Sequence, residues 1–162
     1  MTKQDYLSLK NGTDVRGTAV DGVAGDPVTL TDEAVTSVAK AFYVWAKNKT
    51  GVKNPVIAVG HDSRISAKRM EKLVADAITA CGGSVILTGL SSTPSMFMLL
   101  QDHFGADASV MITASHLPFQ KNGLKFFLKE GGLEGSDITE VLNIAAEGNF
   151  PEGKGSVTHK SY

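Results

Sequence analysis

Short apolar segments alternate with amphipathic segments through the middle of the chain, and this alternation limits the possible folds more than any other feature. The apolar runs cover residues 56–60, 84–88 and 108–113. The segment between the first two runs has apolar residues at helical spacing, and Thr93-Pro94 after the second is typical of a helix start. Strand, helix, strand, helix, strand is the pattern of a parallel sheet with helices on both faces.

The segments on either side of this unit complete one domain. A helix is expected to begin at Thr31, and another to run from Ser136 to just before Gly148. The first thirty residues form an irregular arm in which Asn11-Gly12 predicts a turn and a short hairpin. The prediction is therefore one domain over residues 1–148, with residues 149–162 as a tail or a linker to a second domain.

A fourth apolar run, residues 124–128, follows the third strand after a loop of ten residues. A parallel crossover needs a dozen or more residues, so the fourth strand is expected to run antiparallel to its predecessor. The prediction is a three-layer α/β/α sandwich around a mixed, mostly parallel sheet of about four strands, the last of them antiparallel. This arrangement brings Lys125 close to Ser115 and His116.

Composition excludes several classes of protein. The 162 residues carry a net charge of −1, which gives no support to a nucleic-acid or membrane partner. The single cysteine excludes an internal disulfide framework. The longest apolar run, near residues 95–100, is too short to cross a bilayer, and the N-terminus has no signal core, so a cytoplasmic protein is expected.

Three polar loops follow the three parallel strands, at residues 60–64, 89–94 and 113–118. Ligands bind at the carboxyl ends of the strands in open α/β sheets, so these loops predict the site. Ser115 with His116 suits a nucleophile or a carrier of phosphate, but it also suits a capped turn. Lys125 is either a base or an exposed strand lysine, and Arg16 is either a phosphate ligand or a surface partner of Asp14.

Other motifs point less clearly to a function. The basic residues around the start of the second helix suit an anionic ligand or a solvated helix face; they are Arg64, Lys68, Arg69 and Lys72. No G-x-G-x-x-G, Walker or G-x-S-x-G loop occurs. Asp14 and Asp62 are isolated acids without the spacing of metal ligands.

Four motifs together resemble the phosphohexomutases, the phosphoglucomutase/phosphomannomutase family. They are Gly12-Thr13-Asp14-Val15-Arg16-Gly17, Gly60-His61-Asp62-Ser63-Arg64, Thr113-Ala114-Ser115-His116-Leu117-Pro118 and Asn122-Gly123-Leu124-Lys125. Their order and spacing match the first domain of the family, and the resemblance covers about the first 130 residues clearly.

The resemblance implies reversible transfer of phosphate between the 1- and 6-positions of a hexose through a bisphosphate intermediate. It makes Ser115 the phosphorylated residue, with His116 beside it, Lys125 and Arg16 in acid–base work, and Arg64 and Asn122 in binding substrate or phosphate. Mg²⁺ would bind through the phosphate on Ser115, with its remaining ligands in a second domain. Hexose 1,6-bisphosphate would act as activator, and the other mutase domains would lie in the same chain.

The sequence departs from the family pattern at Leu117, where Asn is more usual, and at His61, where Arg is often found. The family has four domains, and its aspartate-rich D-G-D-G-D-R metal loop does not occur here. The chain is therefore expected to be a first domain that is inactive by itself. The alternatives are a stand-alone module that binds phosphosugars or anions without catalysis, and an interaction module, which the balanced charge disfavours.

Overall fold

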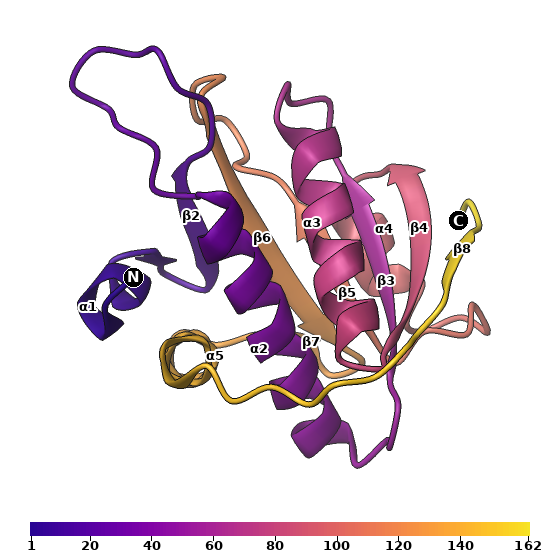
Figure 1. Cartoon of the computed structure of the whole chain (residues 1–162). Helices are drawn as coiled ribbons and strands as arrows, with labels where there is room; N and C mark the ends of the chain where they lie inside the picture. The colour runs from indigo at the N-terminus through magenta and orange to yellow at the C-terminus, as the bar shows by residue number, and fades with distance from the viewer.

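The computed structural model describes every residue from Met1 to Tyr162 and contains one mixed sheet with helices on both faces (Figure 1). In chain order the elements are α1 (Lys3–Leu7), β1 (Lys10–Asn11), β2 (Asp14–Thr18), α2 (Asp32–Thr50), β3 (Val56–His61), α3 (Ala67–Ala80), β4 (Ser84–Leu90), α4 (Thr93–Met98), β5 (Ala108–Ile112), β6 (Lys121–Leu128), β7 (Gly131–Gly132), α5 (Gly135–Glu147) and β8 (Val157–His159).

The predicted α/β sandwich and mixed sheet are confirmed, although the sheet has more strands than expected. Its order is β1-β2-β6-β5-β3-β4-β8, and β7 pairs with β6, which makes eight strands instead of about four. β3 lies parallel to β4 and β5, whereas β6 runs antiparallel to β5, as the ten-residue loop predicts. The hairpin of β1 and β2 agrees with the short hairpin predicted at Asn11-Gly12, whereas β7 and β8 were not predicted, because they have only two and three residues and no run of apolar side chains.

Two apolar clusters of unequal size hold the layers together. The larger cluster contains 33 buried residues and joins the sheet to α2, α3 and α5, which cover one face (Figure 1). In it the rings of Phe42 on α2 and Phe126 on β6 stack with centroids 4.3 Å apart. The smaller cluster contains nine residues and joins α4 and the turns after it to the opposite face. The chain therefore has a core of its own, in three layers.

Helix starts show where local sequence rules hold and where tertiary contacts override them. Thr31 caps α2 as predicted, since its hydroxyl accepts a hydrogen bond from the amide of Ala34. Ser66 precedes α3 but makes no capping bond: its backbone is already helical, and its hydroxyl accepts a hydrogen bond from the Asn122 side chain. Thr93-Pro94 begins α4 as its sequence indicates, and α4 ends at Met98 with only turns after it.

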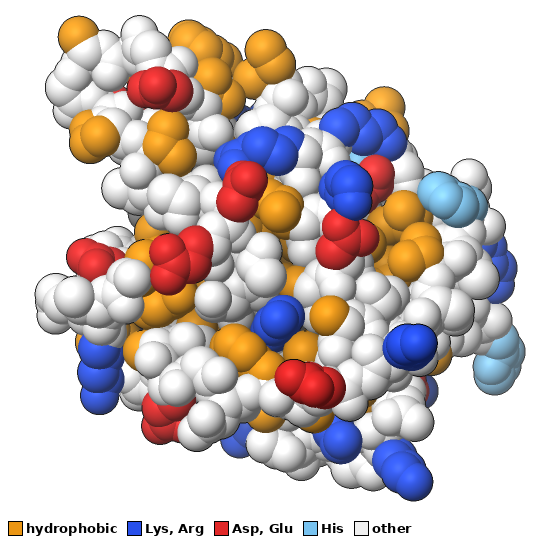
Figure 2. All heavy atoms as spheres, in the orientation of Figure 1, with side chains coloured by type: hydrophobic (Ala, Val, Ile, Leu, Met, Phe, Trp, Pro, Cys, Tyr) orange, Lys and Arg blue, Asp and Glu red, His pale blue; other side chains and the backbone are white.

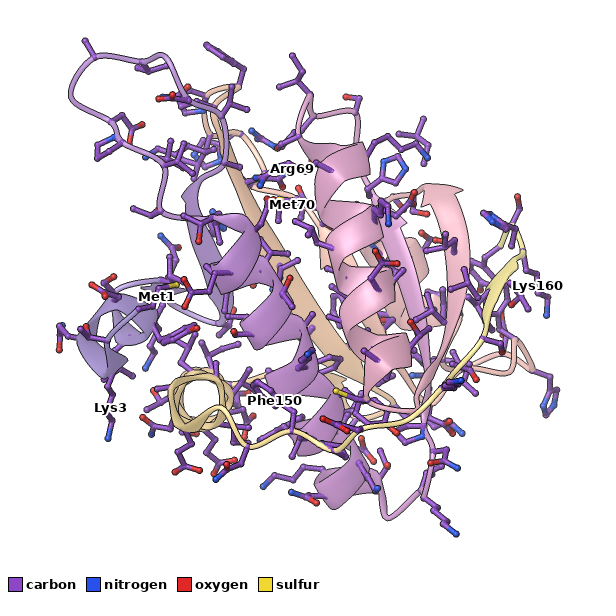
Figure 3. All side chains as sticks on the ribbon, viewed as in Figure 1. Met1, Lys3, Arg69, Met70, Phe150 and Lys160 are labelled. Carbon is purple, nitrogen blue, oxygen red and sulfur yellow. The ribbon has the colours of Figure 1, made fainter.

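The N-terminal arm joins the sheet through a hairpin. Gly12 has a φ of 61°, which suits the tight turn between β1 and β2. β2 then pairs antiparallel with β6. Arg69 of α3 holds the rest of the arm, since its guanidinium donates to the carbonyls of Ala19 at 3.0 Å and Leu30 at 3.1 Å (Figure 3). Strand pairing and the Arg69 side chain thus both fasten the arm to the body.

Residues 149–162, predicted as a tail or linker, cross the end of α3 and add a strand beside β4 (Figure 1). The amides of Gly153 and Gly155 donate to carbonyls in the last turn of α3, each at 2.9 Å. A Cβ on Gly155 would lie 1.6 Å from the carbonyl oxygen of Gly83, so only glycine allows this close crossing. Lys160, labelled in Figure 3, donates to the carbonyl of Phe104 at 2.9 Å. The segment is therefore held on the surface of the domain by backbone hydrogen bonds, with most of its side chains exposed.

Charge is spread over the molecule without a dominant sign. Figure 2 shows acidic and basic side chains interspersed on the face that carries α2 and α3. None of the helices combines the length and the apolar character that a bilayer crossing requires.

Asp26, in the arm, makes the free energy of unfolding depend on pH in the acidic range. Its carboxylate accepts hydrogen bonds from Thr18, Lys121 and Gln120, which lower its pKa from 3.8 to about 2. Because the pKa of Asp26 is lower in the folded state than in the unfolded state, its ionised carboxylate stabilises the fold at pH values above about 4. This stabilisation is lost as the pH falls from about 4 to about 2. Asp26→Asn should therefore flatten part of this acid dependence, measured by urea unfolding at several pH values in this window. If the free energy of unfolding changed with pH equally in the wild-type chain and in Asp26→Asn, the role given to Asp26 would be contradicted.

Candidate active site

Ser115 lies in an exposed loop at the carboxyl end of β5 with an unusual backbone conformation. Its φ of 56° is the only positive value at a residue other than glycine. Its amide donates to the Thr113 hydroxyl at 3.0 Å, and its own Oγ lies 3.4 Å from Nδ1 of His116. Such strain persists only where surrounding contacts hold the chain, and it is often found at functional sites. The loop presents the Ser115 hydroxyl to solvent with His116 as its neighbour.

Arg64 supplies the contacts that hold this loop. Its guanidinium donates to four backbone carbonyls of the neighbouring loop, which are Ser115 at 2.8 Å, Leu117 at 2.9 Å, Pro118 at 2.9 Å and Lys121 at 3.0 Å. Hydrogen bonds from a charged donor are stronger than neutral ones, so this set fixes the loop backbone firmly. A role for Arg64 in binding phosphate stays a prediction; the contacts seen here occupy both terminal nitrogens.

Asp62, which looks isolated in sequence, links the two loops. One carboxylate oxygen accepts from the Thr113 hydroxyl at 2.7 Å, and the other accepts from the amide of Arg64 at 3.1 Å. The amide of Asp62 also donates to the carbonyl of Ile112. Because Thr113 in turn accepts from the Ser115 amide, Asp62 acts on the serine through one intermediate. Sequence spacing gave no signal for this role, since the partners are 51 residues apart.

Asn122 is completely buried beneath the same loops. Its side-chain amide donates to the Ser66 hydroxyl at 2.8 Å, and its oxygen accepts from the amide of Gly123 at 2.9 Å. These contacts join the start of β6 to the start of α3. A contact between Asn122 and substrate stays a prediction, and the burial indicates that its present task is to position the backbone.

Lys125 and Arg16 meet at one carboxylate. Lys125 Nζ lies 3.0 Å from one oxygen of Asp14, and Arg16 Nη2 lies 2.8 Å from the other. Asp14 is only 6% exposed, which shields these ion pairs from solvent. The predicted neighbours of Lys125 were Ser115 and His116, but its ammonium group contacts Asp14. The pairing of Arg16 with Asp14 agrees with one of the two interpretations of Arg16, whereas the contact between Asp14 and Lys125 was not predicted.

Strand register explains how the cluster comes near the serine loop. Arg16 on β2 pairs with Gly123 on β6, and the carbonyl of Gly123 accepts from the amide of Thr113 at 3.1 Å. A Cβ on Gly123 would lie 2.5 Å from the Val15 carbonyl, so glycine lets the three segments approach. Arg16, Gly123 and Thr113 therefore lie side by side on three neighbouring segments. Ser115 follows Thr113 by two residues, and Lys125 follows Gly123 by two residues on β6.

A shallow hollow of about 310 Å³ opens beside Lys125. Phe97 of α4 and Phe127 of β6 are among its walls, and the Lys125 ammonium lies 5.8 Å from the centroid of the Phe127 ring. A cation beside an apolar wall is a common arrangement in sites for small ligands with one charged group.

The residues of this chain do not by themselves fit a metal ion. Nowhere in it do three His, Cys, Asp or Glu side chains gather as a metal site requires. Asp14 and Asp62 are occupied by the ion pairs and hydrogen bonds described above. The Mg²⁺ that the resemblance implies would therefore need ligands from outside this chain.

Comparison with known proteins agrees with the sequence motifs. The family model described as phosphoglucomutase/phosphomannomutase, alpha/beta/alpha domain I, matches residues 9–152. A phosphoglucosamine mutase of Clostridium tetani is 36% identical over 145 residues, which cover 89% of this chain and 30% of that protein. A phosphoglucosamine mutase of Staphylococcus aureus is 39% identical over 121 residues, which cover 74% of this chain and 25% of that protein. The chain thus spans about a third or less of the length of these relatives.

The fold agrees as well. A phosphoglucomutase/phosphomannomutase family protein from Burkholderia thailandensis superposes with a TM-score of 0.79 at 22% identity, over 99% of this chain and 34% of that one. At this level of identity the likeness concerns the fold, whereas the family model covers most of the sequence. The chain belongs to the phosphoglucomutase/phosphomannomutase family, and its residues 9–152 match α/β/α domain I of that family.

Proposed function

We propose that this chain is the phosphoserine domain of a hexose phosphate mutase and that Ser115 carries the phosphoryl group. The observation that supports this most directly is the strained, solvent-exposed Ser115 in a loop held by four hydrogen bonds from Arg64. Phosphoryl transfer depends mainly on alignment and charge stabilisation, and a rigid loop supplies the alignment.

In the proposed reaction a hydroxyl of the sugar attacks the phosphorus of phosphorylated Ser115. The bond between phosphorus and the serine Oγ breaks, the sugar keeps the phosphoryl group, a base takes the proton of the sugar hydroxyl, and the released serine Oγ takes up a proton. In the second half the bisphosphate returns its other phosphoryl group to Ser115. Lys125 is the proposed base when its Nζ is the neutral amine, and Asp14 orients this nitrogen within the cluster beside the loop. Arg16 shares Asp14, and His116 contacts the serine hydroxyl directly.

The names of the relatives support a proposal for the substrate class. Because the curated relatives are phosphoglucosamine mutases, glucosamine phosphate is the first candidate, followed by glucose and mannose phosphates. The remaining domains would supply the residues that recognise the hexose. Mg²⁺ and hexose 1,6-bisphosphate are proposed requirements of the complete enzyme, and a cytoplasmic location stays a prediction.

A mutase assay tests this proposal in the full-length chain that contains residues 1–162. Turnover of glucosamine, glucose or mannose phosphate, with Mg²⁺ and a trace of the matching bisphosphate, is expected. No turnover of any of the three sugars would contradict the proposal and favour an anion-binding module.

The 162-residue chain by itself is expected to fold but not to interconvert these sugars. It has no three-ligand metal cluster, and its hollow beside Lys125 is open. Alignment of bound reactants normally accounts for ~7–11 kcal/mol of the barrier, and this chain aligns only the serine. The measurement is the same coupled assay, with circular dichroism as the control for folding. Sustained turnover by a folded 162-residue chain would show that the further domains are dispensable.

A further inference from the structure

A buried histidine and a buried carboxylate face each other beneath the Ser115 loop. His61 ends β3 and Glu71 lies on α3, with His61 Nε2 and Glu71 Oε2 3.4 Å apart. Both side chains are only 9% exposed, and neither of these two atoms has a hydrogen-bond partner. Unpaired polar atoms are rare in protein interiors, so this contact calls for a physical explanation.

The other ring nitrogen of His61 decides how the pair is protonated. Nδ1 lies 2.7 Å from the carbonyl oxygen of Asp62, and a carbonyl only accepts, so Nδ1 carries a hydrogen. In a neutral ring Nε2 would then be bare, and two acceptors would face each other in the interior. One additional proton between Nε2 and Oε2 removes this conflict. We propose that His61 and Glu71 hold this shared proton and thereby position the Ser115 loop.

The surroundings leave the two groups dependent on each other. The strands on both sides of His61, β4 and β5, carry no acidic or basic side chain. On α3, Lys68 contacts the other oxygen of Glu71 at 3.1 Å, but its side chain is 77% exposed and its charge is screened by solvent. Asp62 and Arg64 are the remaining charged groups nearby, and they pair with each other at 3.4 Å.

The path from the pair to the serine is short. The ring of His61 holds the carbonyl of Asp62, and the carboxylate of Asp62 holds the Thr113 hydroxyl and the Arg64 amide. Thr113 accepts from the Ser115 amide, and Arg64 donates to the Ser115 carbonyl. His61 and Glu71 are therefore positioning residues. Only this positional part rests on the proposed function of Ser115; the location of the proton does not.

Nitrogen-15 NMR of the imidazole rings in the 162-residue chain tests the proton directly. Near neutral pH, a proton on Nδ1 of His61 is expected together with a hydrogen that Nε2 shares with Glu71. A bare Nε2 beside an ionised Glu71, seen in the carboxyl carbon-13 shift, would overturn the proposal. This measurement needs no mutase activity, so it is independent of whether the proposed function holds.

Variants test the link to the loop. Glu71→Gln keeps the size of the side chain, and its amide can donate to a bare Nε2, so the shared proton should be lost while the contact remains. In a His116→Gln background, which removes the nearer titrating ring, the amide signals of Thr113 and Ser115 should follow pH with the same midpoint as the His61 ring. Glu71→Gln should abolish that step, and Lys72→Gln, an exposed charge change on the same helix, should preserve it.

Two outcomes would contradict the positional role. One is a step in the Thr113 and Ser115 signals that persists in Glu71→Gln, and the other is a His61 ring that titrates without any movement of these signals. If Glu71→Gln does not fold, comparison of the ring and loop midpoints in the His116→Gln chain still decides the question.

Discussion

Ser115→Ala is expected to abolish mutase turnover in the full-length chain while leaving the domain folded. The substitution removes the oxygen that would accept the phosphoryl group. Stability should change by no more than ~0.5 kcal/mol, because the side chain is exposed and its hydroxyl makes one long contact, at 3.4 Å to His116. The backbone contacts from Arg64 and Thr113 do not involve the hydroxyl and should hold the loop in the variant.

Three measurements check this expectation together. Intact-mass analysis should find one phosphate on the active wild-type chain and none on Ser115→Ala, and peptide mapping should locate it at Ser115. Ser63→Ala, an exposed serine in the adjacent loop, is the matched control and should keep both phosphate and turnover. Full turnover by Ser115→Ala, or phosphate only at another residue, would contradict the assignment.

Lys125→Ala should slow turnover in the full-length chain by roughly 10²–10⁴-fold, the usual range for loss of a general acid or base. Asp14 orients the Lys125 Nζ, and the lysine side chain is 26% exposed beside a hollow of about 310 Å³, so solvent and a bound sugar have access to this nitrogen in its amine form. The pH–rate profile should lose the limb that belongs to the base.

Lys53→Ala is the control, because Lys53 is an exposed lysine in the loop before β3. Lys125→Arg separates the roles of charge and proton transfer: an arginine keeps the positive charge but cannot give up its proton near neutral pH. Slow turnover by the Lys125→Arg variant would support the assignment of Lys125 as the base. Turnover and a pH profile unchanged in Lys125→Ala would assign the lysine a structural role only.

Most of the sheet could be predicted from the sequence because its central strands are apolar runs bounded by turns. The ten-residue loop was enough to orient β6, and the pairing of Ile112 with Leu124 confirms it. Strands of two or three residues carry too little periodic signal to be recognised. They exist because their neighbours leave an edge to pair with, as β4 does for β8.

The candidate site was predictable in its residue types and less so in its contacts. Strand direction alone predicts that Lys125 lies toward the serine loop, but the ion pair of Lys125 with Asp14 spans 111 residues and depends on the register of β2. The role of Arg64 in holding the Ser115 loop could not be predicted from the sequence, for a different reason. Its partners are backbone carbonyls, which every residue has and no sequence pattern marks.

The two outermost strands have a consequence for the behaviour of the molecule at high concentration. The sheet ends in β1 with two residues on one side and in β8 with three on the other. Long exposed strands are templates on which a second chain can pair and begin to aggregate, and very short ones limit this hazard. If residues 156–160 were removed, the seven residues of β4 would become such a template. We therefore expect the close contact of Gly155 with Gly83, which holds the segment leading to β8 in place, to limit aggregation of the chain.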